Sequence, residues 1–186
     1  MELTPQDLFR LTKAAKTLII WDTESQGLNG DYGSLLVGSA KRYGQDPVTF
    51  QVEQVGNDKK MVREFRDYLN EADAWVTFYG KVHDVPLVNT RLLRWGLAPL
   101  DPKLHVDLFF TLKPKLRTVS KSQAHLTNFL DIPEKKMTVD PKEWGELAAN
   151  FKTGIKVIRA RCESDCFGLE GLFDRTSHLV RDIKRG

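Results

Sequence analysis

The chain has 186 residues, of which 41% are hydrophobic and 28% are charged, and its formal net charge is +3. This composition is typical of one globular domain with a substantial core, and the mildly basic charge permits a polyanionic partner without indicating one. No apolar run approaches the roughly 20 residues needed to span a bilayer, and the acidic N-terminus lacks a signal-peptide core, so we expect a cytoplasmic protein without membrane association.

From the N-terminus, the pattern predicts a short helix, a strand and a hairpin. Thr4-Pro5 supplies a cap and a proline at the first helical position, which predicts a helix over residues 4–15. We assign residues 1–15 to an N-terminal helical extension and residues 16–186 to a single domain. The first strand is expected at 17–23, and 33–43 with 47–53 is expected to form a hairpin that turns at residues 44–46.

Helices and strands alternate through the remainder of the chain. Apolar spacing predicts strands at 75–78 and 105–108, and helices over 58–72, 85–95, 119–130, 141–150 and 156–183. This order of elements predicts an α/β fold in which helices cover the faces of a sheet.

Two carboxylates lie at the end of the first predicted strand. Asp22 and Glu24 are two residues apart, so the alternation of a strand places them on the same side, a few ångströms from each other. Their charges repel, and a divalent cation with a preference for oxygen ligands relieves that repulsion. A polar turn at the end of a strand explains the same triplet, so a metal site requires partners from distant parts of the chain.

Two further carboxylates are candidates for those partners. Asp84 follows the strand at 75–78 and opens the next helix, where it either reaches the same sheet edge or caps the helix. Asp165 lies on the apolar stripe of the last helix; it either ligates a metal or forms a salt bridge, to Arg161 one turn earlier or to a facing helix. Four converging carboxylates fit two divalent cations about 4 Å apart, an arrangement that serves phosphodiester hydrolysis.

This ordered set of motifs resembles the DEDD family of 3′–5′ exonucleases. The likeness is to predicted bacterial and phage exonucleases related to the proofreading domain of B-family DNA polymerases, and it spans about residues 16–180. The motifs that carry it are residues 20–24, 79–84 and 162–165, with 106–108 and 120–130 between them. The resemblance implies a ribonuclease-H-like mixed sheet with helices on both faces.

The resemblance also implies a role for each acid. Asp22, Glu24 and Asp165 would hold the metal that activates water, and Asp22 would also reach a second metal steadied by Asp84; the ions would be Mg²⁺ or Mn²⁺. Asp107 matches an acidic position outside this quartet and is expected to support it, although a capped strand end explains it equally well. The substrate would be single-stranded nucleic acid with a free 3′ end, with DNA favoured over RNA.

Three positions depart from the pattern of these relatives. Tyr79 stands in place of an asparagine, His83 in place of a phenylalanine, and Arg161 in place of the tyrosine that orients the attacking water. The histidine variant of the family is not matched either, because Ala160 occupies that position. The guanidinium of Arg161 remains protonated and cannot act as a general base, so we expect it to contact the scissile phosphate or a carboxylate. His83 is then the candidate for water activation.

Tyr79 and Lys81 are the candidates, beside Arg161, for contacts with bases and phosphates. A basic run over 113–121 either tracks phosphates or is a solvated loop. Three other functions stay open: a nucleic-acid-binding module that has lost catalysis, a structure-selective endonuclease or resolvase, and a scaffold with fortuitous acids. The sequence does not specify the oligomeric state.

Overall fold

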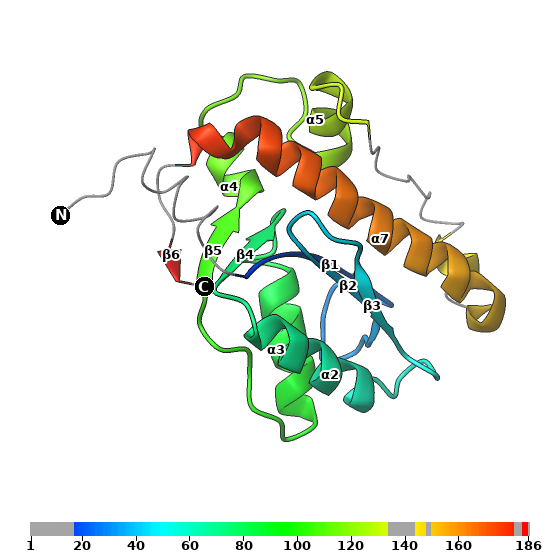
Figure 1. Ribbon diagram of the computed structural model, residues 1–186. Coiled ribbons are helices and arrows are strands. Elements are labelled where there is room, and N and C mark those ends of the chain that lie inside the picture. Colours follow the sequence, from blue (N-terminus) through cyan, green and yellow to red (C-terminus); the bar gives the residue numbers. More distant parts are fainter. Residues whose placement is uncertain (1–16, 134–143, 148–149, 181–183, 186) are drawn as a thin grey trace.

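The computed structural model describes residues 17–133, 144–147, 150–180 and 184–185 (Figure 1). Its strands are β1 (Leu18–Ser25), β2 (Leu35–Arg42), β3 (Val48–Gln51), β4 (Ala74–Thr77), β5 (Leu104–Asp107) and β6 (Lys184–Arg185). Its helices are α2 (Lys59–Asn70), α3 (Asp84–Arg94), α4 (Leu108–Leu112), α5 (Gln123–Phe129), α7 (Phe151–Thr176) and the 3₁₀ turn η1 (Ser177–Leu179). Within the described ranges, no helix combines the length and the apolar character that crossing a membrane requires.

The strands form one mixed sheet in the order β3-β2-β1-β4-β5-β6. The hairpin strands β2 and β3 run antiparallel to their neighbours, β1, β4 and β5 are mutually parallel, and β6 is antiparallel to β5. This arrangement confirms the predicted ribonuclease-H-like α/β fold. It also brings the carboxyl ends of β1, β4 and β5 to one edge of the sheet.

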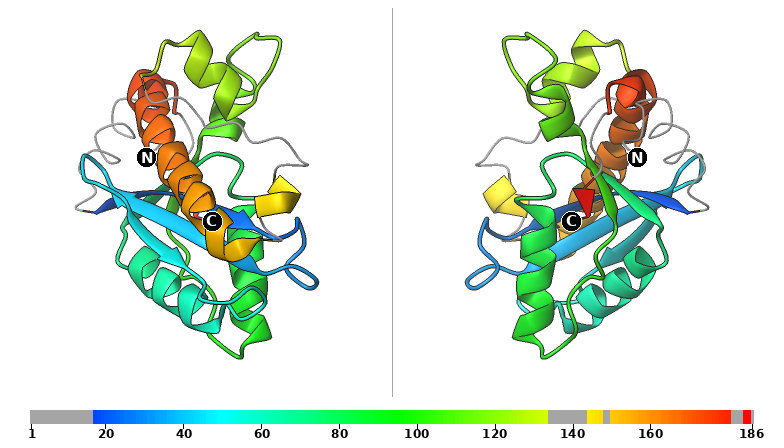
Figure 2. Two further views of the ribbon diagram at one scale, coloured as in Figure 1. Left: turned by 90° about the vertical axis from the view of Figure 1, so that its right-hand side faces the viewer. Right: turned by 90° about the vertical axis from the view of Figure 1, so that its left-hand side faces the viewer.

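Helices cover both faces of the sheet: α7 lies across one face, and α2 and α3 pack on the other (Figures 1 and 2). Alternation along β1 divides its side chains between the two layers. Ile20 packs with apolar side chains of α7, whereas Trp21 packs in the cluster that includes α2 and α3. Asp22 and Glu24 therefore continue the α7 face, and Thr23 continues the opposite face.

Most predicted elements are confirmed, and the differences occur at helix ends. The hairpin turns through Gly44, whose φ of 75° lies in the left-handed region that glycine tolerates. The helix expected over 119–130 begins at Gln123, because the Ser122 side chain accepts a hydrogen bond from the His125 backbone amide and caps it. The last helix begins at Phe151 rather than at 156, and it ends at Thr176, before η1.

Three predicted helices fall wholly or partly outside the described residues, one of them the last helix, at positions 181–183. The helix over 4–15 lies outside them, and of the helix over 141–150 the structure describes 144–147, which are helical, and residue 150. The short helix α4 was not predicted from the sequence. Its cap is the Asp107 side chain, which accepts a hydrogen bond from the Phe109 backbone amide.

A buried ion pair ties α2 and α3 to the hairpin. Asp58 is fully buried, and its carboxylate accepts hydrogen bonds from the Arg91 guanidinium, the Trp95 indole and the Leu35 backbone amide. Arg91 also donates to the backbone carbonyl of Gly30, in the connection between β1 and β2. The network therefore fixes the β1–β2 connection, which follows directly after the strand that carries Asp22 and Glu24.

Candidate metal centre

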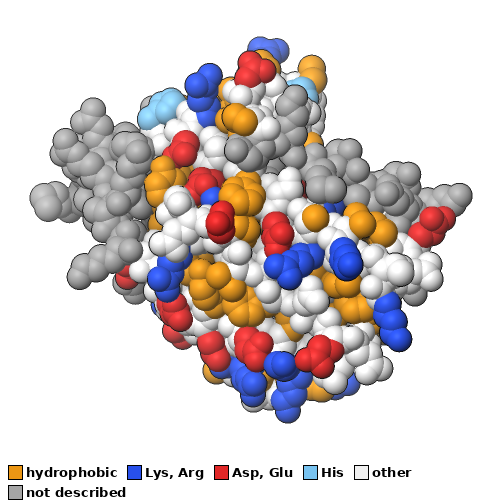
Figure 3. Space-filling model, turned by 45° about the vertical axis from the view of Figure 1, so that its right-hand side comes forward, with side chains coloured by type: hydrophobic (Ala, Val, Ile, Leu, Met, Phe, Trp, Pro, Cys, Tyr) orange, Lys and Arg blue, Asp and Glu red, His pale blue; other side chains and the backbone are white. Residues whose placement is uncertain are grey.

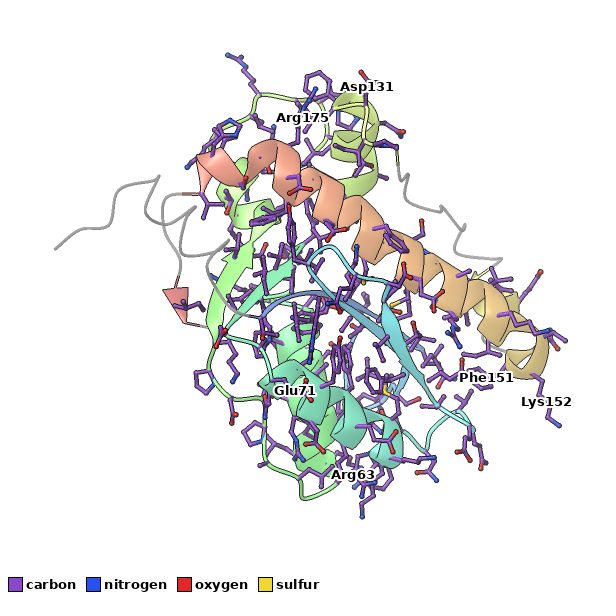
Figure 4. The ribbon with its side chains drawn as sticks, viewed as in Figure 1. Arg63, Glu71, Asp131, Phe151, Lys152 and Arg175 are labelled. Carbon is purple, nitrogen blue, oxygen red and sulfur yellow. The ribbon has the colours of Figure 1, made fainter. Side chains whose placement is uncertain are left out.

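Three of the four predicted carboxylates meet at the carboxyl end of β1. Asp22, Glu24 and Asp165, here called the acidic triad, each offer a ligand oxygen, and these oxygens lie within 4.8 Å of one another. Glu24 and Asp165 are buried and Asp22 is half-buried. Asp165 comes from the middle of α7, between Lys152 near the start of that helix and Arg175 near its end (Figure 4).

Close packing of α7 on β1 and β2 brings Asp165 to the strand. The Cys162 thiol donates to the backbone carbonyl of Asp22 over 3.4 Å, and the Cys166 thiol donates to that of Ser39 over 3.3 Å. Burial is the main cause that raises the pKa of both thiols well above the ordinary value, so both remain protonated. These small, neutral side chains let the helix approach the two strands at the level of the triad.

Arg161 contacts the triad as a cation. One of its guanidinium nitrogens lies 3.0 and 3.1 Å from the two carboxylate oxygens of Glu24, and the guanidinium lies over the Trp144 ring, 5.1 Å from its centroid. Of the two contacts expected for Arg161, the structure shows the one with a carboxylate. The partner is Glu24, across 137 residues of chain.

Asp84 approaches β1 from the other side. Its carboxylate accepts a 2.5 Å hydrogen bond from the Thr23 hydroxyl, and Asp84 is not part of the triad, which is the metal-ligand group found among the described residues. Burial raises the pKa of the Asp84 carboxyl, and the bond from Thr23 lowers it in part. The cause of the separation is the strand itself, because Thr23 and its two acidic neighbours point to opposite faces.

The alternative that Asp84 caps α3 is not the observed arrangement. The helix begins at Asp84, after His83, without a side-chain capping bond at that position. His83 is half-buried and lines an open pocket of about 290 Å³ with Leu28 and Pro86. A role for His83 in activating water therefore stays a prediction.

Asp107 holds the turn at the start of the motif over residues 79–84. This buried carboxylate accepts hydrogen bonds of 2.9 Å from the backbone amides of Tyr79 and Lys81. Tyr79 is exposed beside this turn and Lys81 is half-buried. Asp107 thus holds the segment that carries the candidate substrate contacts, in addition to capping α4.

Sequence reasoning missed several contacts of the site. The sequence pattern gives Thr23 no role except to separate two acids, whereas in the structure its hydroxyl bonds to Asp84. The approach of Trp144 to Arg161 depends on how distant segments pack. Gln123 was also missed; its side-chain amide donates to the backbone carbonyl of Asp165 over 2.9 Å. The signal available in the sequence was the position of Gln123 at the start of the helix that Ser122 caps.

The triad fits a hard divalent cation. Three carboxylates within 4.8 Å concentrate negative charge on oxygen ligands, which Mg²⁺ and Mn²⁺ prefer. The guanidinium of Arg161 balances part of this charge. The face shown in Figure 3 carries acidic and basic side chains interspersed with apolar ones.

Comparison with known families decides the superfamily. A model of the RNase_H superfamily matches residues 19–145, more than half of the chain. The chain belongs to the RNase_H superfamily. The match includes Asp22, Glu24, Asp84 and Asp107, whereas Asp165 lies beyond it on α7. Enzymes of the RNase H type are nucleases that act on nucleic acid with divalent metals, and the acidic triad is compatible with that chemistry.

Solved structures show the same fold in a larger enzyme. The chain is similar to the family B DNA polymerase from the hyperthermophilic archaeon Pyrobaculum calidifontis, with a TM-score of 0.71 and 15% sequence identity. The similarity covers 86% of this chain and 24% of the polymerase, so the chain spans about a quarter of that protein. At this identity the likeness shows a shared fold. A comparison with curated proteins gives no match.

Proposed function

We propose that this chain is a metal-dependent 3′–5′ exonuclease that hydrolyses phosphodiester bonds of single-stranded nucleic acid, with DNA favoured over RNA. The observation that carries the proposal is the acidic triad at the carboxyl edge of an RNase H superfamily sheet. The direction of digestion and the free 3′ end rest on the resemblance of the ordered motifs to DEDD exonucleases. The similarity in fold to a family B DNA polymerase supports the same assignment.

In this proposal, Asp22, Glu24 and Asp165 hold Mg²⁺ or Mn²⁺ through their carboxylate oxygens. Two bound ions supply a nucleophilic water at neutral pH and neutralise charge that develops on the scissile phosphate. Asp84 would be the fourth acid and would hold the second ion in place of its hydrogen bond from the Thr23 hydroxyl. Its position at the first turn of α3, beside the carboxyl end of β4, keeps it at the same edge of the sheet.

Arg161 neutralises charge and does not remove a proton from water, because its guanidinium stays protonated. In the absence of metal it holds Glu24 in place, and with substrate it is free to pair with a phosphate once it leaves that carboxylate. His83, at the start of α3 and next to Asp84, is the proposed proton acceptor. A variant that lacks its imidazole, His83→Phe, should lower the rate without changing metal affinity.

The test uses a single-stranded DNA oligonucleotide labelled at its 5′ end, with Mg²⁺ or Mn²⁺. We expect a ladder of products shortened from the 3′ end, slower digestion of RNA with the same sequence, and loss of activity in Asp22→Asn and Asp165→Asn. Asp174→Asn is the matched control, because Asp174 is an exposed carboxylate on the same helix, bonded by the Tyr43 hydroxyl. Turnover by Asp22→Asn equal to that of the wild type would refute the proposal, and cleavage of circular strands would favour an endonuclease.

One observation favours a second function, a nucleic-acid-binding module that has lost catalysis. The Arg161 guanidinium lies against Glu24, which the proposal assigns as a metal ligand. If that pair persists in the presence of metal, the site lacks both a ligand and the water-orienting tyrosine of the relatives. This alternative predicts binding of single strands without turnover at any concentration of Mn²⁺.

A further inference from the structure

Exposed apolar side chains gather at the sheet edge that carries the acidic triad. Five of them lie in segments that follow the carboxyl ends of β1, β4 and β5: Leu28, Tyr32, Tyr79, Val82 and Phe110. Large apolar groups that remain exposed together mark a surface that binds another molecule. Their segments leave the sheet at the edge where β1 carries the triad.

Three aromatic rings within this region pack against one another. The rings of Tyr79 and Phe110 are stacked, with centroids 5.8 Å apart and an interplanar angle of 21°. Phe109 lies edge-on to both, with centroid distances of 4.8 and 5.2 Å. Tyr79 and Phe110 are 45% and 42% exposed, so this aromatic platform, made of Tyr79, Phe109 and Phe110, still presents ring surface to solvent.

The backbone of Tyr79 is strained to present its ring. Its φ is 67°, in the left-handed region, which a bulky side chain rarely adopts and which costs about 1–3 kcal/mol. Such strain persists where surrounding contacts enforce it, and it concentrates at functional sites. Asparagine is among the residues that best tolerate this conformation. A tyrosine at this position therefore lowers the stability of the fold, so we infer that its ring serves a function other than stability.

One buried carboxylate positions both halves of the platform. Asp107 accepts hydrogen bonds from the backbone amides of Tyr79 and Lys81, and a third, of 3.0 Å, from the Phe109 amide at the start of α4. It is 2% exposed, so these bonds are shielded from water. The turn that carries Tyr79 and the helix that carries Phe109 and Phe110 are thus fixed relative to each other by a single side chain.

Basic groups accompany the rings. The ammonium of Lys113, an exposed residue, lies 5.5 Å from the centroid of the Phe109 ring, and Lys81 belongs to the turn of Tyr79. Aromatic faces beside cations are the features that bind single-stranded nucleic acid without sequence preference. The turn that carries Tyr79 follows β4 and the helix that carries Phe110 follows β5, so both leave the sheet at the edge where β1 carries the triad.

We propose that Tyr79 and Phe110 form a stacking subsite for a nucleobase of the substrate strand, held in place by Asp107 as a positioning residue. The proposal rests on the proposed function, because it takes the acidic triad as the point where the strand is cut. It specifies what that function leaves open: the base is bound through its ring face, so the subsite accepts any base and fails on a nucleotide that lacks one.

The test measures the affinity of a fluorescein-labelled single-stranded DNA of about 12 nucleotides, in EDTA so that no cleavage occurs. Tyr79→Asn relieves the strain and should fold with an unchanged or higher melting temperature, yet bind about tenfold more weakly. Phe110→Ala should weaken binding to a similar extent. Phe129→Ala, which removes another exposed aromatic stacked on a neighbouring ring, His125, should bind like the wild type.

Two further measurements separate stacking from a structural effect. An oligonucleotide with abasic positions should bind wild type and Tyr79→Asn equally, because neither protein then has a base to stack. Asp107→Asn should weaken binding of the normal strand by itself, but should add nothing in a background that already carries both Tyr79→Asn and Phe110→Ala. An additional loss there would show that Asp107 does not act through the two rings.

The outcomes also distinguish this proposal from the proposed function. If wild type cleaves single strands and Tyr79→Asn and Phe110→Ala bind as tightly as wild type, the subsite is refuted and the exonuclease proposal stands. If the wild type neither binds nor cleaves, the proposed function fails together with the subsite. If Tyr79→Asn and Phe110→Ala change only the self-association of the chain, the platform is a protein interface and the subsite is refuted.

Discussion

Replacement of Arg161 by glutamine tests how the site balances its charge without metal. The guanidinium donates a hydrogen bond to Oε2 of Glu24 and forms an ion pair with Oε1, and the two side chains are 19% and 10% exposed, so the pair is largely but not fully buried. A charge-assisted hydrogen bond of this kind contributes about 2 kcal/mol, between the values of exposed and buried ion pairs. Arg161→Gln should therefore lower the stability of the metal-free protein by about that amount.

The same number predicts the response to metal. A cation that binds Glu24 must displace Arg161 from it, so the wild type loses the pair on binding and the variant has nothing to lose. The Kd for Mn²⁺ should fall about 30-fold in Arg161→Gln, which corresponds to about 2 kcal/mol. The melting temperature of the metal-free variant should lie about 4–8 °C below that of the wild type, and saturating Mn²⁺ should bring the two close together.

Calorimetric titration with Mn²⁺ and thermal unfolding with and without the metal measure both quantities. Arg159→Gln is the matched control, because Arg159 is two residues away on α7 and pairs with Glu163 on an exposed face. Its effect on stability should stay below about 1 kcal/mol, and its response to Mn²⁺ should equal that of the wild type. An unchanged or weaker Mn²⁺ affinity in Arg161→Gln would refute the competition, because Arg161 would then support the metal-bound state.

Three further predictions concern the rest of the molecule. Asp58→Ala should destabilise the protein by about 3–5 kcal/mol in urea unfolding, because it strands a buried guanidinium, whereas Glu71→Ala, at an exposed pair, should cost less than about 1 kcal/mol. Burial lowers the pKa of His105 to about 3, so the unfolded chain binds a proton that the folded protein excludes, and stability is lost as the pH falls from about 6.5 toward 3. At pH 4.5 the loss from this group is about 3 kcal/mol, and His105→Gln should flatten the dependence of the melting temperature on pH over that range. Cys162 and Cys166 should resist alkylation in the native protein at pH 8 and react in urea; rapid native labelling would contradict their burial.

Local patterns predicted the order of helices and strands and all three acids of the triad. The apolar run before Asp22 specified a buried strand, and the two-residue period of a strand placed Asp22 and Glu24 on one face. Gly44 marked the hairpin turn because it tolerates a positive φ. Asp165 was recognised by helical spacing on the buried stripe of α7. Each of these inferences needs only neighbours in the sequence, and each is visible in the structure.

The partners of the polar side chains depended on the tertiary structure. Thr23 and Asp84 are 61 residues apart, and only the packing of α3 on the face of β1 opposite α7 brings the hydroxyl to the carboxylate. The contact of Arg161 with Glu24 depends on the angle at which α7 crosses the strand. Hydrophobic periodicity specifies which face of an element is buried, but not which distant group that face meets.

The sequence by itself determined a sheet with an acidic pair at the end of its first strand and a carboxylate on a late helix. The tertiary structure decided that three acids form one group while Asp84 bonds to Thr23, and that Asp107 holds Tyr79 in a left-handed conformation. The physical reason is that buried charges and a strained backbone are stabilised by contacts between distant segments. A pattern of residue types along the chain does not specify those contacts.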